Sequence, residues 1–193
     1  MCVAEAGAGA EAVAAAWSTP VGLLALTLTE ASRARVVRLV LDAPDSYAAG
    51  PHGYAPVPGE PAGSRRGEDP LIPAQLAHAR LCRLVRNAHA AGVQRPGDPR
   101  LEALTEVAER RLLVALADQP DRLDRHAGDR AQLVRAVADV ARRADGWTAP
   151  LRPARREEPV LAIHGARLAL AEATRIVLRN GLAGLGAGAP ERM

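Results

Sequence analysis

Apolar residues recur at helical spacing through most of the chain beyond residue 71. In the first such stretch, Ala77, Leu81, Leu84, Val85 and Ala88 share one helix face, as expected where a helix packs on a core. The predicted helices span about residues 73–91, 98–117, a short stretch after Pro120, 129–144 and 158–182. Five helices with short connections predict a mainly α fold, an antiparallel helical bundle.

Residues typical of helix ends accompany this pattern. Gly92, Gly146 and Gly181 follow or close apolar stretches and are expected to act as C-terminal stops. Asp98 followed by Pro99 is typical of the first turn of a helix and predicts where the second helix begins.

The first 70 residues follow a different pattern. We expect residues 1–16 to be disordered or loosely helical, and residues 21–29 to form a strand, because apolar and polar residues alternate there. Thr29 can cap a following helix that reaches about Leu41, so residues 17–41 form a strand-helix unit. Eleven of the 29 residues from 42 to 70 are Gly or Pro, which predicts a flexible linker over 42–68. The helical domain then spans 69–193.

Composition restricts how the core is filled. There is no Phe, and the aromatic residues are Trp17, Tyr47, Tyr54 and Trp147. Ala, Leu and Val must therefore fill the core, which favours closely packed helices. All 25 basic residues are Arg, as a GC-rich genome would favour, and Arg is well suited to contact phosphate groups.

Charge is distributed unevenly along the chain. Residues 1–70 carry 5 Arg and 8 acidic residues, whereas residues 71–193 carry 20 Arg and 14 acidic residues. A net charge of −3 is thus followed by one of +6, and a basic module behind an acidic leader is compatible with an RNA partner.

Several classes of protein are disfavoured. Cys2 and Cys82 cannot build a disulfide framework, and the five His are scattered without ligand spacing, so we expect no metal and no cofactor. No apolar run reaches the length of a membrane span, and the N-terminal residues lack the basic region of a signal peptide. We expect a cytoplasmic protein without a membrane partner.

Four segments together resemble a known family. They are residues 69–82, which contain Ala77-His78-Ala79-Arg80, residues 110–120, residues 167–182 and residues 189–193. In order and spacing they resemble the DALR-type anticodon-binding domain of class I arginyl-tRNA synthetases. Residues 20–28 are similar to the strand that closes the N-terminal additional domain of the same enzymes. The resemblance implies a helical fold and binding of tRNA, with arginine tRNA as the expected partner.

The signatures of the synthetase active site are missing. The chain has no His-x-Gly-His sequence, and without Lys it has no K-M-S-K-S-type loop. There is also no G-x-x-x-x-G-K phosphate loop. We therefore expect no catalytic residues and no aminoacylation by this polypeptide.

The resemblance also implies candidate tRNA-binding residues on the first and last helices and in the segments beside them. They are Gln75, His78, Arg80, Arg83, Trp147, Arg175, Arg179, Asn180, Arg192 and Met193. The tyrosines of the family's first motif are replaced here by Ile72 or Pro73 and by Leu76. Because stacking on an aromatic ring contributes roughly 1–3 kcal/mol per base, this loss should weaken binding.

Three alternatives remain open at this point. The bundle could be a degenerate anticodon domain that docks on a protein partner, such as a synthetase or a tRNA-dependent enzyme. It could be an accessory subunit whose catalytic partner is a separate chain. Each Arg could also simply lie on a solvated helix face, paired with acids such as Glu172. A Cys–His nucleophile from His78 and Cys82, four residues apart on one helix, is a further but weaker alternative.

Overall fold

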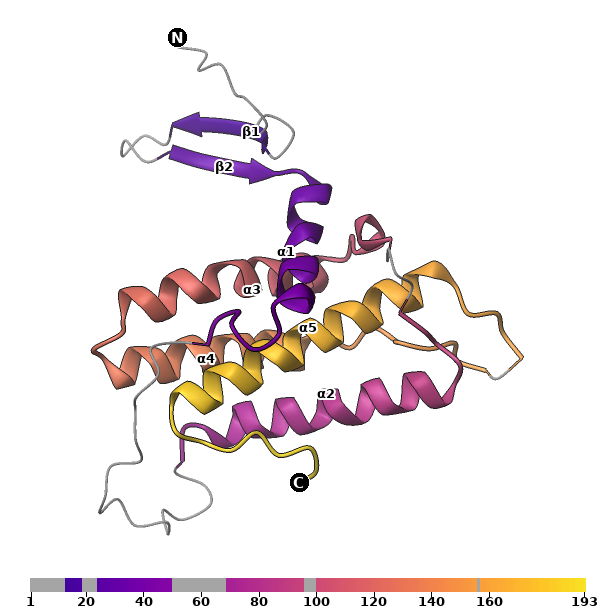
Figure 1. Cartoon of the computed structure of the whole chain (residues 1–193). Helices are drawn as coiled ribbons and strands as arrows, with labels where there is room; N and C mark the ends of the chain where they lie inside the picture. The colour runs from indigo at the N-terminus through magenta and orange to yellow at the C-terminus, as the bar shows by residue number, and fades with distance from the viewer. Residues whose placement is uncertain (1–12, 19–23, 50–68, 96–99, 156) are drawn as a thin grey trace.

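The computed structural model describes residues 13–18, 24–49, 69–95, 100–155 and 157–193. Four long helices make up the bundle: α2 (Ile72–Ala90), α3 (Val107–Arg125), α4 (Arg130–Gly146) and α5 (Ala162–Gly184). In Figure 1, α2, α4 and α5 run side by side, and α3 packs mainly on α4. The expected mainly α bundle is confirmed.

Helix α5 is the centre of this bundle. Most of its residues are buried, including Leu168, Leu170, Val177 and Leu178, and it packs against α1, α2 and α4. A helix that is buried around most of its circumference must be surrounded, so α5 lies inside and the amphipathic helices enclose it.

Small aliphatic residues fill the core, as expected. Ala74, Ala77 and Ala88 of α2 are completely buried. Alanine leaves the helix axes free to approach closely, which compensates for the scarcity of large side chains. Trp147 is the aromatic member of the buried cluster among the described residues.

The leader packs on the bundle through helix α1 (Glu30–Asp42). The backbone N–H of Ser32 donates to Thr29 Oγ1 at 3.2 Å, so the expected cap at Thr29 is confirmed. Val36, Val37 and Val40 are buried against α3, α5 and the short 3-10 helix η1 (Leu101–Ala103). Two antiparallel strands, β1 (Val13–Ser18) and β2 (Leu24–Leu28), lie beyond the start of α1 (Figure 1).

Two expectations for the leader are wrong in part. Val13–Ser18 form strand β1, where part of a disordered segment was expected; residues 1–12 lie outside the described residues. Residues 43–49, expected to begin a flexible linker, form a turn in which Ala48 is buried. Residues 50–68, the remainder of that linker, also lie outside the described residues.

The boundaries of α3 differ most from expectation. It begins at Val107, where Glu106 N donates to Glu109 Oε2 at 3.0 Å in a capping box, and not near Asp98. The proposed cap at Asp98 and Pro99 lies outside the described residues. The expected break at Pro120 is wrong, because α3 continues through it to Arg125 and no separate short helix follows.

The start of α5 also lies later than predicted. The helix begins at Ala162 instead of near Glu158. Glu158 Oε2 instead accepts hydrogen bonds from the backbone N–H groups of Ala154 and Arg155, at 3.2 and 3.4 Å. These bonds close a turn in the loop before the helix.

Candidate nucleic-acid interface

One face of α2 lies along a basic groove. Leu76, Arg80, Arg83 and Asn87 recur at intervals of three or four residues, so they line the same side of the helix. The buried face, which includes Leu81 and Val85, is turned toward α4 and α5.

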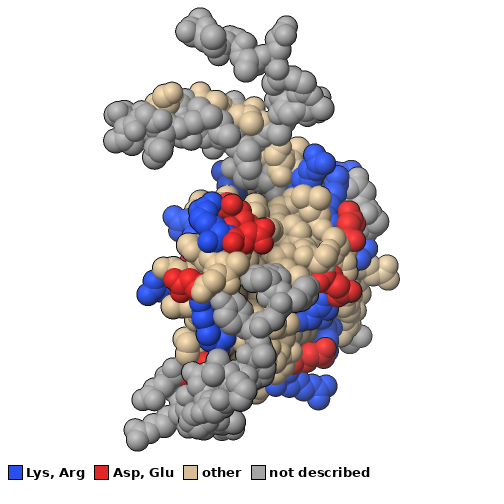
Figure 2. All heavy atoms as spheres, turned by 60° about the vertical axis from the view of Figure 1, so that its left-hand side comes forward, with Lys and Arg blue, Asp and Glu red and all other residues tan. Residues whose placement is uncertain are grey.

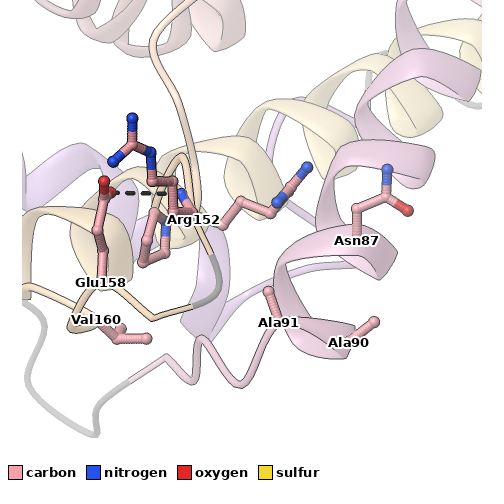
Figure 3. Close-up of a pocket in the computed structure, with 8 residues that line it drawn as sticks. Asn87, Ala90, Ala91, Arg152, Glu158 and Val160 are labelled. Atoms are coloured by element: carbon pink, nitrogen blue, oxygen red, sulfur yellow. Dashed lines mark hydrogen bonds between the residues drawn. The ribbon is translucent and has the colours of Figure 1, made fainter.

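The groove consists of three adjoining hollows of about 540, 340 and 640 Å³. Arg80 lines the first two, and Asn87, Arg152 and Pro153 line the second and third. Figure 3 shows the third hollow, with Asn87, Ala90 and Ala91 on the α2 side and Arg152, Glu158 and Val160 on the loop side. The groove therefore runs along α2, from the C-terminal segment to the loop between α4 and α5.

Six Arg side chains and three Asp or Glu side chains line this groove. The carboxylates are all engaged: Asp145 by Arg80, Glu191 by Arg86, and Glu158 by the backbone of its own turn. Over the part of the chain that the structure describes, no ion pair or hydrogen bond engages four of the guanidinium groups. They belong to Arg83, Arg152, Arg155 and Arg192.

The face shown in Figure 2 carries both signs of charge. On the face shown in Figure 2, Arg and acidic side chains are interspersed and form no continuous basic surface. Asp139, for example, lies within 3.2 Å of Arg122, Arg142 and Arg143. Partial burial alone would raise the pKa of Asp139, but hydrogen bonds from Arg122 and Arg143 hold it below its ordinary value. The distribution of charge on this face therefore indicates no basic surface there.

Arg80 has a structural role at the edge of the groove. Its Nη2 donates to the carbonyl of Ala144, and its Nε lies 3.2 Å from Asp145 Oδ1. The guanidinium therefore supplies a hydrogen-bond donor to the Ala144 carbonyl at the C-terminal end of α4 and fixes the start of the following loop. Arg83, one turn further along α2, is exposed and points its charge into the groove.

Trp147 does not present its ring to a ligand. Its exposed fraction is 2%, and it lies in the core beneath the loop that follows α4. The ring lines the floor of the second hollow together with Leu84 and Leu151. Trp147 shapes the groove from below, and stacking of a base on its face would require the loop to move.

Gln75 and His78 contact the C-terminal segment of the chain. Gln75 Nε2 donates to the carbonyl of Gly188 at 2.9 Å, and His78 Nδ1 lies 2.9 Å from the carbonyl oxygen of Pro190. His78 is 3% exposed. Burial lowers its pKa below the ordinary value, the hydrogen bond to Pro190 opposes this, and the positive charges of Arg175 and Arg179 add to the lowering.

The thiol of Cys82 lies 3.8 Å from the ring of His78, but it is buried. A nucleophile must be reached by its substrate, and Cys82 and His78 are only 1% and 3% exposed in the small hollow that they line, so the pair is poorly accessible. The part of the chain that the structure describes also contains no group of His, Cys, Asp or Glu able to hold a metal ion. Likewise, none of the described helices combines the length and hydrophobicity needed to cross a membrane.

The candidates near the end of α5 contact α2 residues and the turn after α1. Arg175, His78 and Arg179 line a separate hollow of about 190 Å³. Arg179 Nη2 donates to the carbonyl of Pro44 and to Asp45 Oδ1, both at 2.8 Å. Asn180 is buried and donates to the carbonyls of Pro44 and Tyr47. Arg179 and Asn180 thus anchor the turn that follows α1.

The structure therefore separates the candidate tRNA-binding residues into those that line the groove and those that contact other parts of the chain. Arg80, Arg83, Arg192 and Met193 line the groove, whereas Gln75, His78, Arg179 and Asn180 hold parts of the chain in place. Sequence reasoning missed Arg152 and Arg155 in the loop before α5. The run Pro150-Leu-Arg-Pro-Ala-Arg-Arg156, with basic residues between prolines, was the available signal.

The fold and the site together define a helical-bundle domain with a basic groove along α2. Residues 74–193 match the DALR anticodon binding domain family, so this chain belongs to that family. An arginine–tRNA ligase of Kineococcus radiotolerans is 40% identical over 135 residues, which cover 67% of this chain and 24% of the relative. An arginine–tRNA ligase of Moorella thermoacetica is 37% identical over 136 residues, covering 68% of this chain and 24% of the relative.

Among solved structures, Thermus thermophilus arginyl-tRNA synthetase matches 62% of this chain and 20% of its own. The sequence identity is 27% and the TM-score is 0.49. The chain matches only 24% of the length of the two ligases above. The resemblance inferred from the four sequence segments is confirmed at the level of the family.

Proposed function

We propose that this chain is a tRNA-binding module that holds the anticodon arm of tRNA, with arginine tRNA as the preferred ligand. The observation that carries the proposal is the groove along α2, which contains four arginines without a partner and no unpaired carboxylate among its described residues. Membership of an anticodon-binding family supports RNA as the polyanion. A tRNA ligand also supports the cytoplasm as the compartment.

The groove would bind the tRNA mainly through phosphate groups. Arg83 and Arg192 lie at one end and Arg152 and Arg155 at the other, so an extended strand along α2 would meet cations along its length. Four phosphate contacts to a single strand predict a slope of about −3 in a plot of log affinity against log salt concentration.

Base recognition would rest on aliphatic and polar groups. Leu76 and Met193, which are 50% and 66% exposed, form an apolar wall in the first hollow. Asn87 offers an exposed amide to a base edge between the second and third hollows. A wall of this kind excludes water around a base but lacks the stacking energy of an aromatic ring, so we expect modest affinity.

We further propose that the chain does not form arginyl-adenylate by itself. It lacks the catalytic signatures named above, and the family match falls on an anticodon-binding domain. Arginine-dependent exchange of pyrophosphate into ATP should stay at background with the purified chain. Exchange well above background would refute this part of the proposal.

The decisive test is tRNA binding by the full chain at two salt concentrations, with arginine tRNA and an unrelated tRNA. A double variant, Arg83→Ala with Arg152→Ala, should lose affinity and reduce the salt slope from about −3 to about −1.5. Its matched control is Arg111→Ala with Arg135→Ala, which removes two exposed arginines outside the groove. Equal losses in both variants would show unspecific attraction and exclude the groove.

A protein partner is the second candidate, and one observation favours it. Val107 and Val114 lie two turns apart on α3 and are 62% and 44% exposed, on a surface that the groove does not use. A chain that binds no tRNA but co-purifies with a synthetase through this face would support the protein-interaction function instead. Val114→Glu would then abolish the complex without affecting the groove.

A further inference from the structure

The C-terminal segment Leu185–Met193 has no helical or strand structure of its own, yet it follows α2 closely. It turns back after α5 at Gly186, whose φ is 73°, and Figure 1 shows it running alongside the first part of α2. A segment of this kind needs partners for its backbone carbonyls, and here side chains supply them.

Three side chains of α2 provide these contacts in register. Gln75 Nε2 donates to the carbonyl of Gly188 at 2.9 Å, and His78 Nδ1 lies 2.9 Å from that of Pro190. Arg86 Nη2 donates to the carbonyl of Glu191 at 3.5 Å, and its Nη1 lies 3.8 Å from the Glu191 carboxylate. The segment therefore runs in the same direction as α2, with the carbonyls of Gly188, Pro190 and Glu191 contacted by residues progressively further along the helix.

This contact determines where the last two residues lie. Beyond Glu191, Arg192 and Met193 line the first hollow of the groove, opposite Leu76, Ala79 and Arg83. Met193 supplies much of the exposed apolar wall, and Arg192 is one of the four unpaired cations. Neither residue is fixed by a hydrogen bond or ion pair within the described chain, so their placement depends on the contacts before them.

We propose that Gln75 and His78 are positioning residues, which act on RNA by holding the segment Gly188–Glu191 so that Arg192 and Met193 complete the groove. His78 is 3% exposed and its Nδ1 is occupied, which leaves Nε2, 3.8 Å from the Cys82 thiol, as its remaining polar atom. The motif on the first helix thus builds one wall of the site instead of reading bases. The inference rests on the proposed function of the groove.

The first test needs no RNA. The sequence contains only two methionines, Met1 and Met193, so a methyl-labelled sample gives a resonance that reports on the segment. In Gln75→Ala and in His78→Leu the Met193 methyl signal should move to the position of an unfolded peptide. In the matched control Gln132→Ala, which removes a half-buried glutamine from α4, it should stay in place. An unmoved signal in both α2 variants would overturn the proposal.

The second test is a double-mutant cycle with arginine tRNA. Each α2 substitution should weaken binding about fivefold or more, as expected for loss of one base or phosphate contact. In a chain that already carries Arg192→Ala and Met193→Ala, the same substitutions should cause no further loss. Losses that multiply in this background would show that Gln75 or His78 contacts the RNA directly, and would overturn the proposal.

The two tests separate the inference from the function on which it rests. If the parent chain binds no tRNA, the proposed function fails and the role of the two residues in RNA binding is overturned with it. The Met193 signal still shows whether they hold the segment. His78→Leu changes a buried position, so its thermal unfolding is compared with that of the parent chain. Gln75→Ala tests the same proposal at a half-buried position, where the fold is less affected.

Discussion

The hydroxyl of Tyr47 donates a hydrogen bond of 2.9 Å to the backbone carbonyl of Leu116, in the middle of α3. Four residues further along the helix stands Pro120, which has no N–H to offer that carbonyl. The turn after α1 therefore supplies the donor that the proline lacks. This contact explains why α3 continues to Arg125 and why the leader is part of the bundle.

Removing this hydroxyl should destabilise the fold. Tyr47→Phe leaves the Leu116 carbonyl without its donor, and we expect a loss of about 1–2 kcal/mol in the free energy of unfolding by urea. Pro120→Ala restores a helical N–H, so the same substitution should cost less in that background. Equal costs in the two backgrounds would show that the hydroxyl does not compensate for the proline.

The Tyr47 hydroxyl should lose its proton at a higher pH than an ordinary tyrosine. Burial, and to a lesser extent the negative charge of Asp118, raises the pKa of Tyr47 from 10.0 to about 12. The unfolded chain ionises first, so this contribution to stability is complete below pH 10 and is lost as the pH rises toward 12. Urea unfolding between pH 9 and 11 should show a steeper decline in the parent chain than in Tyr47→Phe. Identical slopes would contradict the shift.

A buried ion pair connects α5 to the first turn of α3. Arg167 Nε donates to Glu109 Oε1 at 2.8 Å, and Glu109 is completely buried. Arg167→Met should reduce the free energy of unfolding by about 3–5 kcal/mol, because it leaves a buried carboxylate without its partner. Arg125→Met is the control, since the pair of Arg125 with Asp121 is exposed and should contribute less than about 1 kcal/mol. Similar costs at the two sites would count against this assignment.

Gly181 allows α5 to approach α4 closely. A Cβ built on it would lie 2.7 Å from Cγ2 of Val137, a branched side chain with little freedom to move. Gly181→Ala should therefore destabilise the parent chain by about 1–2 kcal/mol, as overpacking outweighs the gain in helix propensity.

Whether Gly181→Ala destabilises or stabilises the chain should depend on Val137. In a Val137→Ala background the space is free, so Gly181→Ala should stabilise by up to about 1 kcal/mol. Gly128→Ala serves as the control, since no atom lies within 4 Å of the added methyl group. A loss of stability in the Val137→Ala background would show that the glycine is needed for another reason.

Local sequence patterns were sufficient to predict several helices. The ranges predicted for α2 and α4 agree with Ile72–Ala90 and Arg130–Gly146 to within about two residues, the usual uncertainty of helix ends. Asp129 caps α4 by accepting from the N–H of Gln132. Amphipathic spacing, caps and stops involve residues close in sequence, so these elements were predictable.

The C-terminal end of α3 was not predictable by the same means. A proline within an apolar pattern ordinarily marks a helix end, and here that rule fails because Tyr47, 69 residues before Leu116, provides the missing donor. A hydrogen bond between segments so far apart leaves no periodic trace in the sequence.

In the candidate site, too, some features were predictable from the sequence and others depended on contacts between distant segments. The sequence by itself determined an aliphatic helical bundle, an excess of Arg after residue 70 and a set of motif residues that includes Gln75, His78 and Asn180. Only the tertiary structure decided that these three hold backbone carbonyls and that Arg152 and Arg155 have no charge partner among the described residues. The physical reason is that a side chain is free for a ligand only when no partner lies within reach, and those partners come from other segments of the chain.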